Sequence, residues 1–119
     1  MIAIIDYGVG NLFSLASSLK SLGLETEVTR DAAAIRAADH IILPGVGAFA
    51  DAMAKLEATG LVPVIKQEVE HKPLLGICLG MQLLFEKSYE YGEHAGLGLI
   101  PGEVCPLADD LKDPSLKVP

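Results

Sequence analysis

Short, continuously apolar segments alternate along the chain with segments whose apolar residues recur at helical spacing. Apolar runs at residues 1–6, 40–43 and 73–75, with a β-prone run at 26–29, predict four strands. Continuous runs, rather than an alternation of apolar and polar residues, indicate strands that helices cover on both faces, as in a parallel sheet. The helical spacing between the runs predicts helices at residues 12–22, 32–38, 49–59 and 63–71.

Alternation of strands and helices with short connections is typical of a doubly wound α/β fold with a mainly parallel sheet. Right-handed crossovers place the carboxyl ends of such strands along one edge, and ligands bind at that edge. A chain of 119 residues, of which 50% are hydrophobic, is long enough to bury one core. We therefore predict a flavodoxin-like unit, with residues 1–119 belonging to one domain.

Charge and apolar balance argue against several classes of protein. The net charge of −7 and the scattered Lys and Arg residues argue against a nucleic-acid surface, which needs a basic patch. No apolar run approaches the roughly 20 residues of a membrane span, and residues 1–6 lack the basic start of a signal peptide. We expect a cytoplasmic protein whose two cysteines, Cys78 and Cys105, are free thiols.

Cys78 lies at the centre of Gly76-Ile77-Cys78-Leu79-Gly80, between an apolar strand and the segment 81–86, whose sequence favours a helix. A nucleophile between two such glycines at a strand-to-helix turn is the pattern of a nucleophile elbow. The helix N-terminus would favour the thiolate, and the Leu79 N–H would face an oxygen that develops negative charge on a substrate carbonyl. The alternative is a buried cysteine that acts as a small apolar residue.

Two further glycine-rich segments follow predicted strands. Pro44-Gly45-Val46-Gly47 follows the third strand, on the same edge as Cys78, and its glycines allow the backbone to approach a ligand. An ordinary glycine-rich turn is the alternative. Gly8 and Gly10 follow the first strand, but Phe13 replaces the third glycine of a dinucleotide-binding fingerprint, so nucleotide binding is not predicted.

Three motifs together resemble one family. The heptapeptide 76–82 resembles the nucleophile motif of class I (triad-type) glutamine amidotransferases, and residues 44–49 look like the oxyanion loop of that family. Residues 6–12, Asp-Tyr-Gly-Val-Gly-Asn-Leu, are similar to the opening of the amidotransferase subunits of imidazole glycerol phosphate synthases. The resemblance covers nearly all of this chain.

The resemblance implies a glutaminase reaction and assigns roles to residues of the three motifs. Cys78 attacks the side-chain amide of L-glutamine, and the N–H of Leu79 with that of Val46 or Gly47 holds the oxyanion. The backbone of Gly45 and Gly47 and the side chain of Gln82 position the substrate. Ammonia then passes to a partner, the (β/α)8 barrel subunit of the synthase, in histidine biosynthesis. No cofactor or metal is implied.

Asn11 is a candidate for contact with the barrel subunit, because the family's asparagine in this loop lies at that interface. Its alternative role, as the N-cap of the following helix, is compatible with such a contact. Cys105 is expected to be a structural residue, because no pair of glycines brackets it.

The chain departs from the family in its histidines. A cysteine nucleophile of this kind needs a histidine base and a carboxylate, which in the family lie far downstream. His40 and His71 precede Cys78 and are expected to be remote from it, and His94 does not match the family's catalytic position. We therefore expect a chain that is truncated at the C-terminus, about three-fifths of such a subunit, and catalytically incomplete. Its uncovered apolar surface would favour self-association.

Two other readings stay open on the sequence. Another cysteine-elbow α/β hydrolase, of the kind that includes small proteases and deglycases, would need a histidine where Leu79 stands or a carboxylate at the first strand. A non-enzymatic flavodoxin-like binding or receiver module is suggested by Asp6 at the end of the first strand. A receiver, however, requires a phosphoacceptor aspartate where Leu43 and Pro44 stand.

Overall fold

The main sheet has the predicted parallel arrangement. The computed structural model describes residues 1–107 and 115. Its four parallel strands lie in the order β2-β1-β3-β4 and comprise β1 (Ile2–Ile5), β2 (Thr26–Thr29), β3 (His40–Leu43) and β4 (Leu74–Gly76). Each predicted strand therefore forms within a residue or two of its expected bounds, and the doubly wound α/β prediction is confirmed.

The predicted helices also form, with small differences at their ends. They are α1 (Leu12–Ser21), α2 (Ala32–Ala37), α3 (Phe49–Ala58) and α4 (Val62–Glu68). The side chain of Asn11 accepts a hydrogen bond from the Ser14 N–H at 3.2 Å, and that of Asp31 accepts one from the Ala33 N–H at 3.1 Å. These N-caps satisfy backbone donors that a helix start leaves free, and they fix where α1 and α2 begin.

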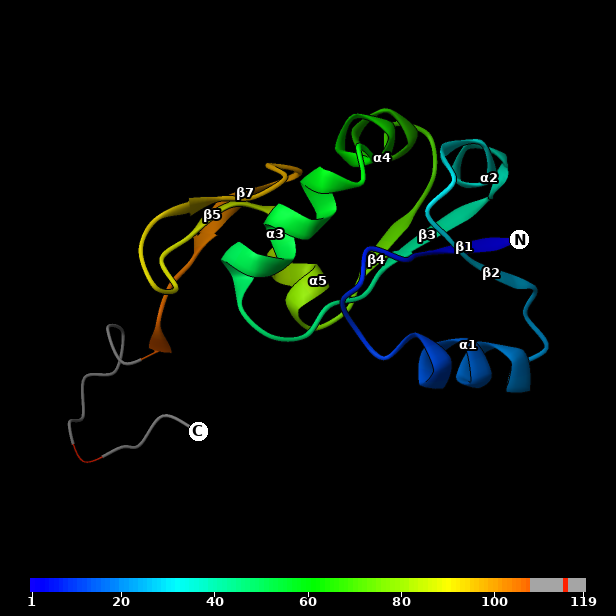
Figure 1. The fold of residues 1–119 in the computed structure, drawn as a ribbon, viewed down its shortest axis with the longest axis horizontal. Coiled ribbons are helices and arrows are strands. Elements are labelled where there is room, and N and C mark those ends of the chain that lie inside the picture. The colour runs from blue at the N-terminus through cyan, green and yellow to red at the C-terminus, as the bar shows by residue number, and fades with distance from the viewer. Residues whose placement is uncertain (108–114, 116–119) are drawn as a thin grey trace.

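The helices cover the two faces of the sheet unequally. α2 and α4 lie on one side of the sheet and α1 lies alone on the other (Figure 1). The main buried cluster is on the side of α2 to α4 and includes Ile5, Ile35, Leu43, Phe49 and Ile65. α1 contributes no fully buried residue. The sheet is therefore packed tightly on one face and only partly covered on the other.

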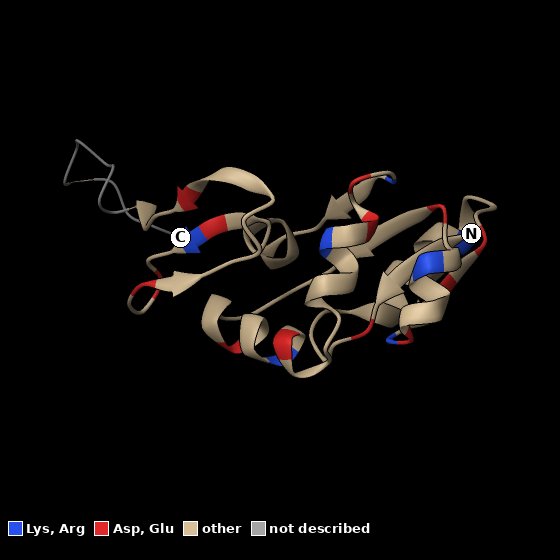
Figure 2. Cartoon of the chain, turned by 90° about the horizontal axis from the view of Figure 1, so that it is seen from above, with Lys and Arg blue, Asp and Glu red and all other residues tan. Residues whose placement is uncertain are grey.

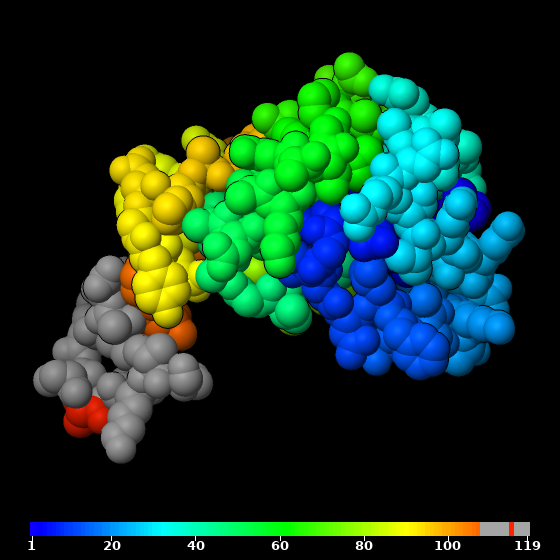
Figure 3. All heavy atoms as spheres, in the orientation of Figure 1, coloured from blue at the N-terminus to red at the C-terminus, as the bar shows by residue number. Residues whose placement is uncertain are grey.

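The segment after Cys78 differs from the prediction. The helix α5 has a single turn (Leu79–Gln82), so the helix expected to reach residue 86 is wrong beyond Gln82. The chain after Gln82 instead forms a second sheet. Its strands are β5 (Phe85–Ser88), β6 (His94–Ala95) and β7 (Ile100–Val104), in the order β6-β5-β7. Figure 3 shows this segment in yellow and orange at one end of the molecule, beside α3. Pairing of Phe85 with Ile100 and of Ser88 with Val104 overrides the local helical preference.

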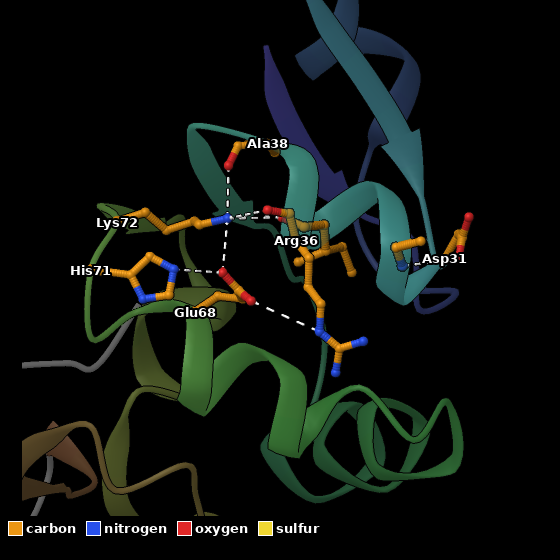
Figure 4. Close-up of polar contacts among 8 residues, drawn as sticks. Asp31, Arg36, Ala38, Glu68, His71 and Lys72 are labelled. Atoms are coloured by element: carbon orange, nitrogen blue, oxygen red, sulfur yellow. Dashed lines mark hydrogen bonds and ion pairs between the residues drawn. The ribbon is translucent and has the colours of Figure 1, made fainter.

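An ion-pair network joins the end of α4 to α2 (Figure 4). Glu68 and Lys72 are nearly buried in it and His71 is exposed. The Lys72 ammonium lies 2.9 Å from Glu68 Oε2 and donates to the carbonyls of Ile35, Arg36 and Ala38 at 2.7–3.1 Å. His71 Nε2 also lies 2.9 Å from Glu68 Oε2. The ammonium thus satisfies carbonyls at the C-terminus of α2, where a positive charge is favourable. The lowered pKa of Glu68 reflects mainly its hydrogen bond from Lys72.

Charged residues are spread over the described part of the chain. Figure 2 shows Lys and Arg dispersed among Asp and Glu over several elements rather than gathered on one face. Every helix within the described residues falls short of the length and apolarity that crossing a bilayer requires.

Candidate active site

Cys78 adopts a backbone conformation that residues with a Cβ rarely take. Its φ of 53° and ψ of −121° lie outside the three regions allowed to ordinary residues. Its side chain is exposed to solvent at the turn from β4 into α5. The buried-cysteine alternative is therefore wrong, and Cys78 has both the strain and the exposure of a nucleophile elbow.

The glycines on either side of Cys78 are required by close packing. A Cβ on Gly76 would lie 2.7 Å from the Met81 Cα, and a Cβ on Gly80 would overlap the Leu43 carbonyl oxygen. Neither position accepts a larger residue without movement of backbone. The two glycines thus let the strand, the turn and α5 meet closely enough to form the elbow.

The glycine loop after β3 lies directly against the elbow. The Leu79 N–H donates to the Gly45 carbonyl oxygen at 3.2 Å, and a Cβ on Gly45 would lie 2.7 Å from the Gly80 nitrogen. Gly47 has a φ of +97°, and Val46 beside it is 59% exposed. The structure therefore brings together the elbow and the loop at residues 44–47, as the sequence predicted.

In this conformation the backbone donors at the start of α5 are all engaged. Besides the Leu79 N–H, those of Gly80, Met81 and Gln82 donate to carbonyls of Ile77 and Cys78 at 2.9–3.3 Å. The acceptor for the Leu79 N–H, the Gly45 carbonyl, belongs to the Gly45–Val46 peptide. If that peptide turned over, the Leu79 N–H would be free and the Val46 N–H would point to the same side.

The loop after β1 supports the loop after β3. The buried Tyr7 hydroxyl donates to the Pro44 carbonyl, and burial raises the pKa of Tyr7 to about 12, so it stays a donor at neutral pH. A Cβ on Gly10 would lie 3.1 Å from the Pro44 Cβ. Tyr7 and Gly10 therefore fix the position of Pro44, while residues 46 and 47 remain exposed to solvent.

A cavity of about 400 Å³ lies between α5 and the second sheet, lined by Gln82, Glu90 and Cys105 with Val104, Pro106 and Leu107. Gln82 is a predicted site residue, whereas Glu90 was missed. The Glu90 carboxylate accepts a hydrogen bond from the Phe49 N–H, the first residue of α3, at 2.9 Å. Cys105 is exposed here, and a purely structural role for it remains a prediction.

The histidines hold positions away from a catalytic pairing. His40 begins β3 at the amino-terminal end of the strand, opposite the carboxyl end where the elbow lies, as expected. His71 pairs with Glu68. The His94 ring lies 3.0 Å from the Tyr91 carbonyl. Within residues 1–107 and 115, no group of three or more His, Cys, Asp or Glu side chains is arranged to hold a metal ion. The described site thus contains the exposed Cys78 thiol and backbone donors, and none of these contacts supplies it with a base.

Solved structures support the fold. A crystal structure of a glutamine amidotransferase superposes with a TM-score of 0.75 at 22% identity, covering 94% of this chain and 60% of that chain. A putative peptidase E protein from Listeria monocytogenes superposes with a TM-score of 0.67 at 18% identity, covering 83% of this chain and 62% of that one. At these identities the likeness concerns the fold alone.

Sequence relatives share one printed name, imidazole glycerol phosphate synthase subunit HisH. Those from Exiguobacterium sibiricum and Moorella thermoacetica are 51% and 57% identical over 98% and 97% of this chain. The relative from Aquifex aeolicus is 53% identical over 95%. The chain spans only 55–60% of the length of these three relatives.

The family model "Glutamine amidotransferase class-I" matches residues 3–104, which include the elbow and both glycine loops. This chain therefore belongs to the class I glutamine amidotransferase family.

Proposed function

We propose that this chain is the amino-terminal part of a single amidotransferase domain, the cytoplasmic glutaminase subunit of an imidazole glycerol phosphate synthase. The observation that carries the proposal is the exposed, strained thiol of Cys78 against the loop that contains Gly45 and Gly47. The names of the relatives, at about 50% identity over nearly the whole chain, support the choice of synthase.

The cavity beside α5 has the polarity to seat L-glutamine. Glutamine carries an α-ammonium group, for which the Glu90 carboxylate is a complementary charge, and Gln82 lines the same cavity with an amide. The backbone of Gly45 and Gly47 would hold the reacting amide beside Cys78. Cys78 and the glycine loop do not line this cavity, so in this proposal the amino-acid end of glutamine lies in the cavity and its side-chain amide extends out of it toward Cys78.

In the proposed reaction the Cys78 thiolate attacks the amide carbon of glutamine, and the carbonyl π electrons move to oxygen. The Gly45–Val46 peptide turns over, so that the N–H groups of Leu79 and Val46, or Gly47, bind that oxyanion. Breaking the hydrogen bond from the Leu79 N–H to the Gly45 carbonyl oxygen costs about 1 kcal/mol. An oxyanion donor typically contributes about 100- to 1,000-fold in rate, so its stabilisation of the transition state exceeds the cost of turning the peptide.

Collapse of the tetrahedral intermediate breaks the C–N bond and forms a γ-glutamyl thioester on Cys78. A histidine, which the resemblance assigns to sequence downstream of the match, takes the proton of the Cys78 thiol and gives it to the departing nitrogen, so that ammonia leaves. The neutral histidine then deprotonates the water that hydrolyses the thioester to glutamate and returns the proton to Cys78. Ammonia passes to the (β/α)8 barrel subunit, with Asn11 at the contact. We expect this chain alone to bind glutamine and to turn it over poorly.

Protection of the two thiols from alkylation tests the site. With limiting iodoacetamide and peptide mapping, L-glutamine should slow modification of Cys78 at least fivefold, and Cys105, which lines the proposed seat, should be protected as well. Glu90→Gln is a matched variant, because its amide oxygen still accepts from the Phe49 N–H while the charge is lost. We expect it to weaken the protection of Cys78. Equal protection by L-glutamine and D-glutamine, or protection that needs no Glu90 charge, would contradict the proposed seat.

A further inference from the structure

The side chain of Tyr7 extends from the loop after β1 to the loop after β3. Its ring belongs to the main buried cluster, and the residue is 3% exposed. Its hydroxyl donates to the Pro44 carbonyl, and a Cβ on Gly45 would lie 2.8 Å from the hydroxyl oxygen. The hydroxyl therefore lies against the Pro44–Gly45 peptide, which directly precedes the peptide that is proposed to turn over.

The backbone that carries Tyr7 is fixed on both sides. The Asp6 N–H donates to the Thr29 carbonyl at 2.9 Å, and the Asp6 carboxylate accepts from the Gly8 N–H at 3.3 Å. Because the ring is also packed in the core, the hydroxyl has little freedom to follow an acceptor that moves. Tyr7 is thus a rigid donor to the loop after β3.

Pro44 has no free backbone dihedral while Tyr7 holds its carbonyl. The pyrrolidine ring fixes φ at about −65°. The hydrogen bond from Tyr7 fixes the direction of the carbonyl and therefore ψ. Turning of the Gly45–Val46 peptide then changes ψ of Gly45 and φ of Val46, the two dihedrals that flank its plane. The movement begins at Gly45, and the backbone before it stays in place.

We propose that Tyr7 is a positioning residue for the oxyanion donors. Its hydroxyl keeps the Pro44–Gly45 peptide against the elbow while the next peptide turns. The N–H of Val46 or Gly47 then reaches the same oxyanion as the Leu79 N–H. This role rests on the proposed function, because it concerns the same reaction. Tyr7 acts through Pro44 and Gly45 and does not touch the reacting atoms.

The alternative role for Tyr7 is to fill the core, and phenylalanine separates the two roles. Tyr7→Phe keeps the buried ring and removes only the donor. The Pro44 carbonyl can then rotate, and the oxyanion donors that follow it shift. A misplacement of about 1 Å in a reacting geometry costs about 100-fold in rate. We expect Tyr7→Phe to slow a reaction of Cys78 that forms an oxyanion and to leave other reactions of the same thiol unchanged.

The test uses the para-nitrophenyl γ-ester of L-glutamate, because its leaving group departs as an anion and needs no histidine to protonate it. The Cys78 thiolate adds to the ester carbon, and the carbonyl π electrons move to oxygen. Collapse breaks the C–O bond and gives a γ-glutamyl thioester and nitrophenolate. The burst of nitrophenolate and the mass of the Cys78 peptide measure acylation. In Tyr7→Phe its maximal rate should fall at least tenfold, whereas the half-saturating ester concentration should change less than twofold.

Two controls separate positioning from a general loss of structure. Iodoacetamide loses iodide without forming an oxyanion, so its rate at Cys78 should change less than twofold in Tyr7→Phe. Thr59→Val also removes a hydroxyl that donates to a carbonyl, that of Leu56, at the end of α3 away from the loop. Its acylation rate should equal that of the unsubstituted chain.

A measurement on the unsubstituted chain does not depend on how the variant folds. The buried hydroxyl proton of Tyr7 should keep its NMR signal after acylation of Cys78, whereas the Leu79 amide signal should shift. Equal acylation rates in the chain and in Tyr7→Phe, a parallel fall in the iodoacetamide rate, or loss of the Tyr7 hydroxyl signal on acylation would overturn the proposal. These results would leave the proposed function standing. Absence of any acylation at Cys78 in the unsubstituted chain would contradict both.

Discussion

Replacing Cys78, the proposed nucleophile, by glycine should stabilise the protein. Cys78 has a φ of 53° and a ψ of −121°, a conformation that costs a residue with a Cβ about 1–3 kcal/mol. Glycine removes that cost, but it adds conformational freedom to the unfolded chain, worth about 0.5–1 kcal/mol. Because the side chain is exposed, little burial is lost. The net expectation for Cys78→Gly is a gain of about 1 kcal/mol in the free energy of unfolding.

Urea unfolding followed by circular dichroism measures this difference directly, and a melting temperature about 4 °C higher should accompany it. Cys105→Gly is the control, since Cys105 is also an exposed free cysteine and does not have a positive φ. It should lose about 0.5–1 kcal/mol. If Cys78→Gly were destabilising by as much as Cys105→Gly, the backbone at Cys78 would not be strained in solution.

Substitutions at three further positions test the parts that hold and surround the site. Gly80→Ala should lower the free energy of unfolding by about 3 kcal/mol in urea titrations, because its Cβ overlaps the Leu43 carbonyl; a loss under about 1 kcal/mol would show that the loops separate easily. Lys72→Met should lower the free energy of unfolding by more than a typical substitution does, which is about 1 kcal/mol. Lys72 lowers the pKa of Glu68, so their pairing stabilises fully above the ordinary carboxyl pKa of 4.5 and is lost as pH falls through the lower folded value. Stability curves from pH 3 to 7 should therefore be flatter on the acid side in Lys72→Met, and an unchanged slope would argue against the pairing. Asn11→Asp should keep the N-cap of α1, whereas Asn11→Ala should lose it. The affinity for a purified barrel subunit separates the two roles of Asn11. A lower affinity in both variants indicates a contact, and a lower affinity in Asn11→Ala alone indicates only a cap.

The sequence predicted the main sheet well because its signals are local. Continuous apolar runs, helical spacing and the caps at Asn11 and Asp31 each act within a few residues, and the structure follows them closely. The contact between Gly45 and Gly80 was also predictable, because parallel strands bring the loops after β3 and β4 to one edge.

Long-range pairing accounts for what the sequence did not predict. Residues 81–86 favour a helix locally, yet Phe85 pairs with Ile100, fifteen positions away, and the helix stops at Gln82. Glu90 was missed for the same reason, since only the second sheet carries it to the start of α3. The engaged state of the Leu79 N–H depends on the orientation of one peptide, which no residue pattern specifies.

The most direct test of the central claim compares the two thiols with an electrophile that resembles the substrate. A diazoketone analogue of glutamine is incubated with the chain, and peptide mapping by mass spectrometry gives the rate of modification at Cys78 and at Cys105. We predict that Cys78 reacts at least tenfold faster than Cys105 and that L-glutamine removes the difference, whereas a simple alkylating agent discriminates less. Equal rates at the two cysteines, or preference for Cys105, would contradict the assignment of Cys78 as the glutamine nucleophile.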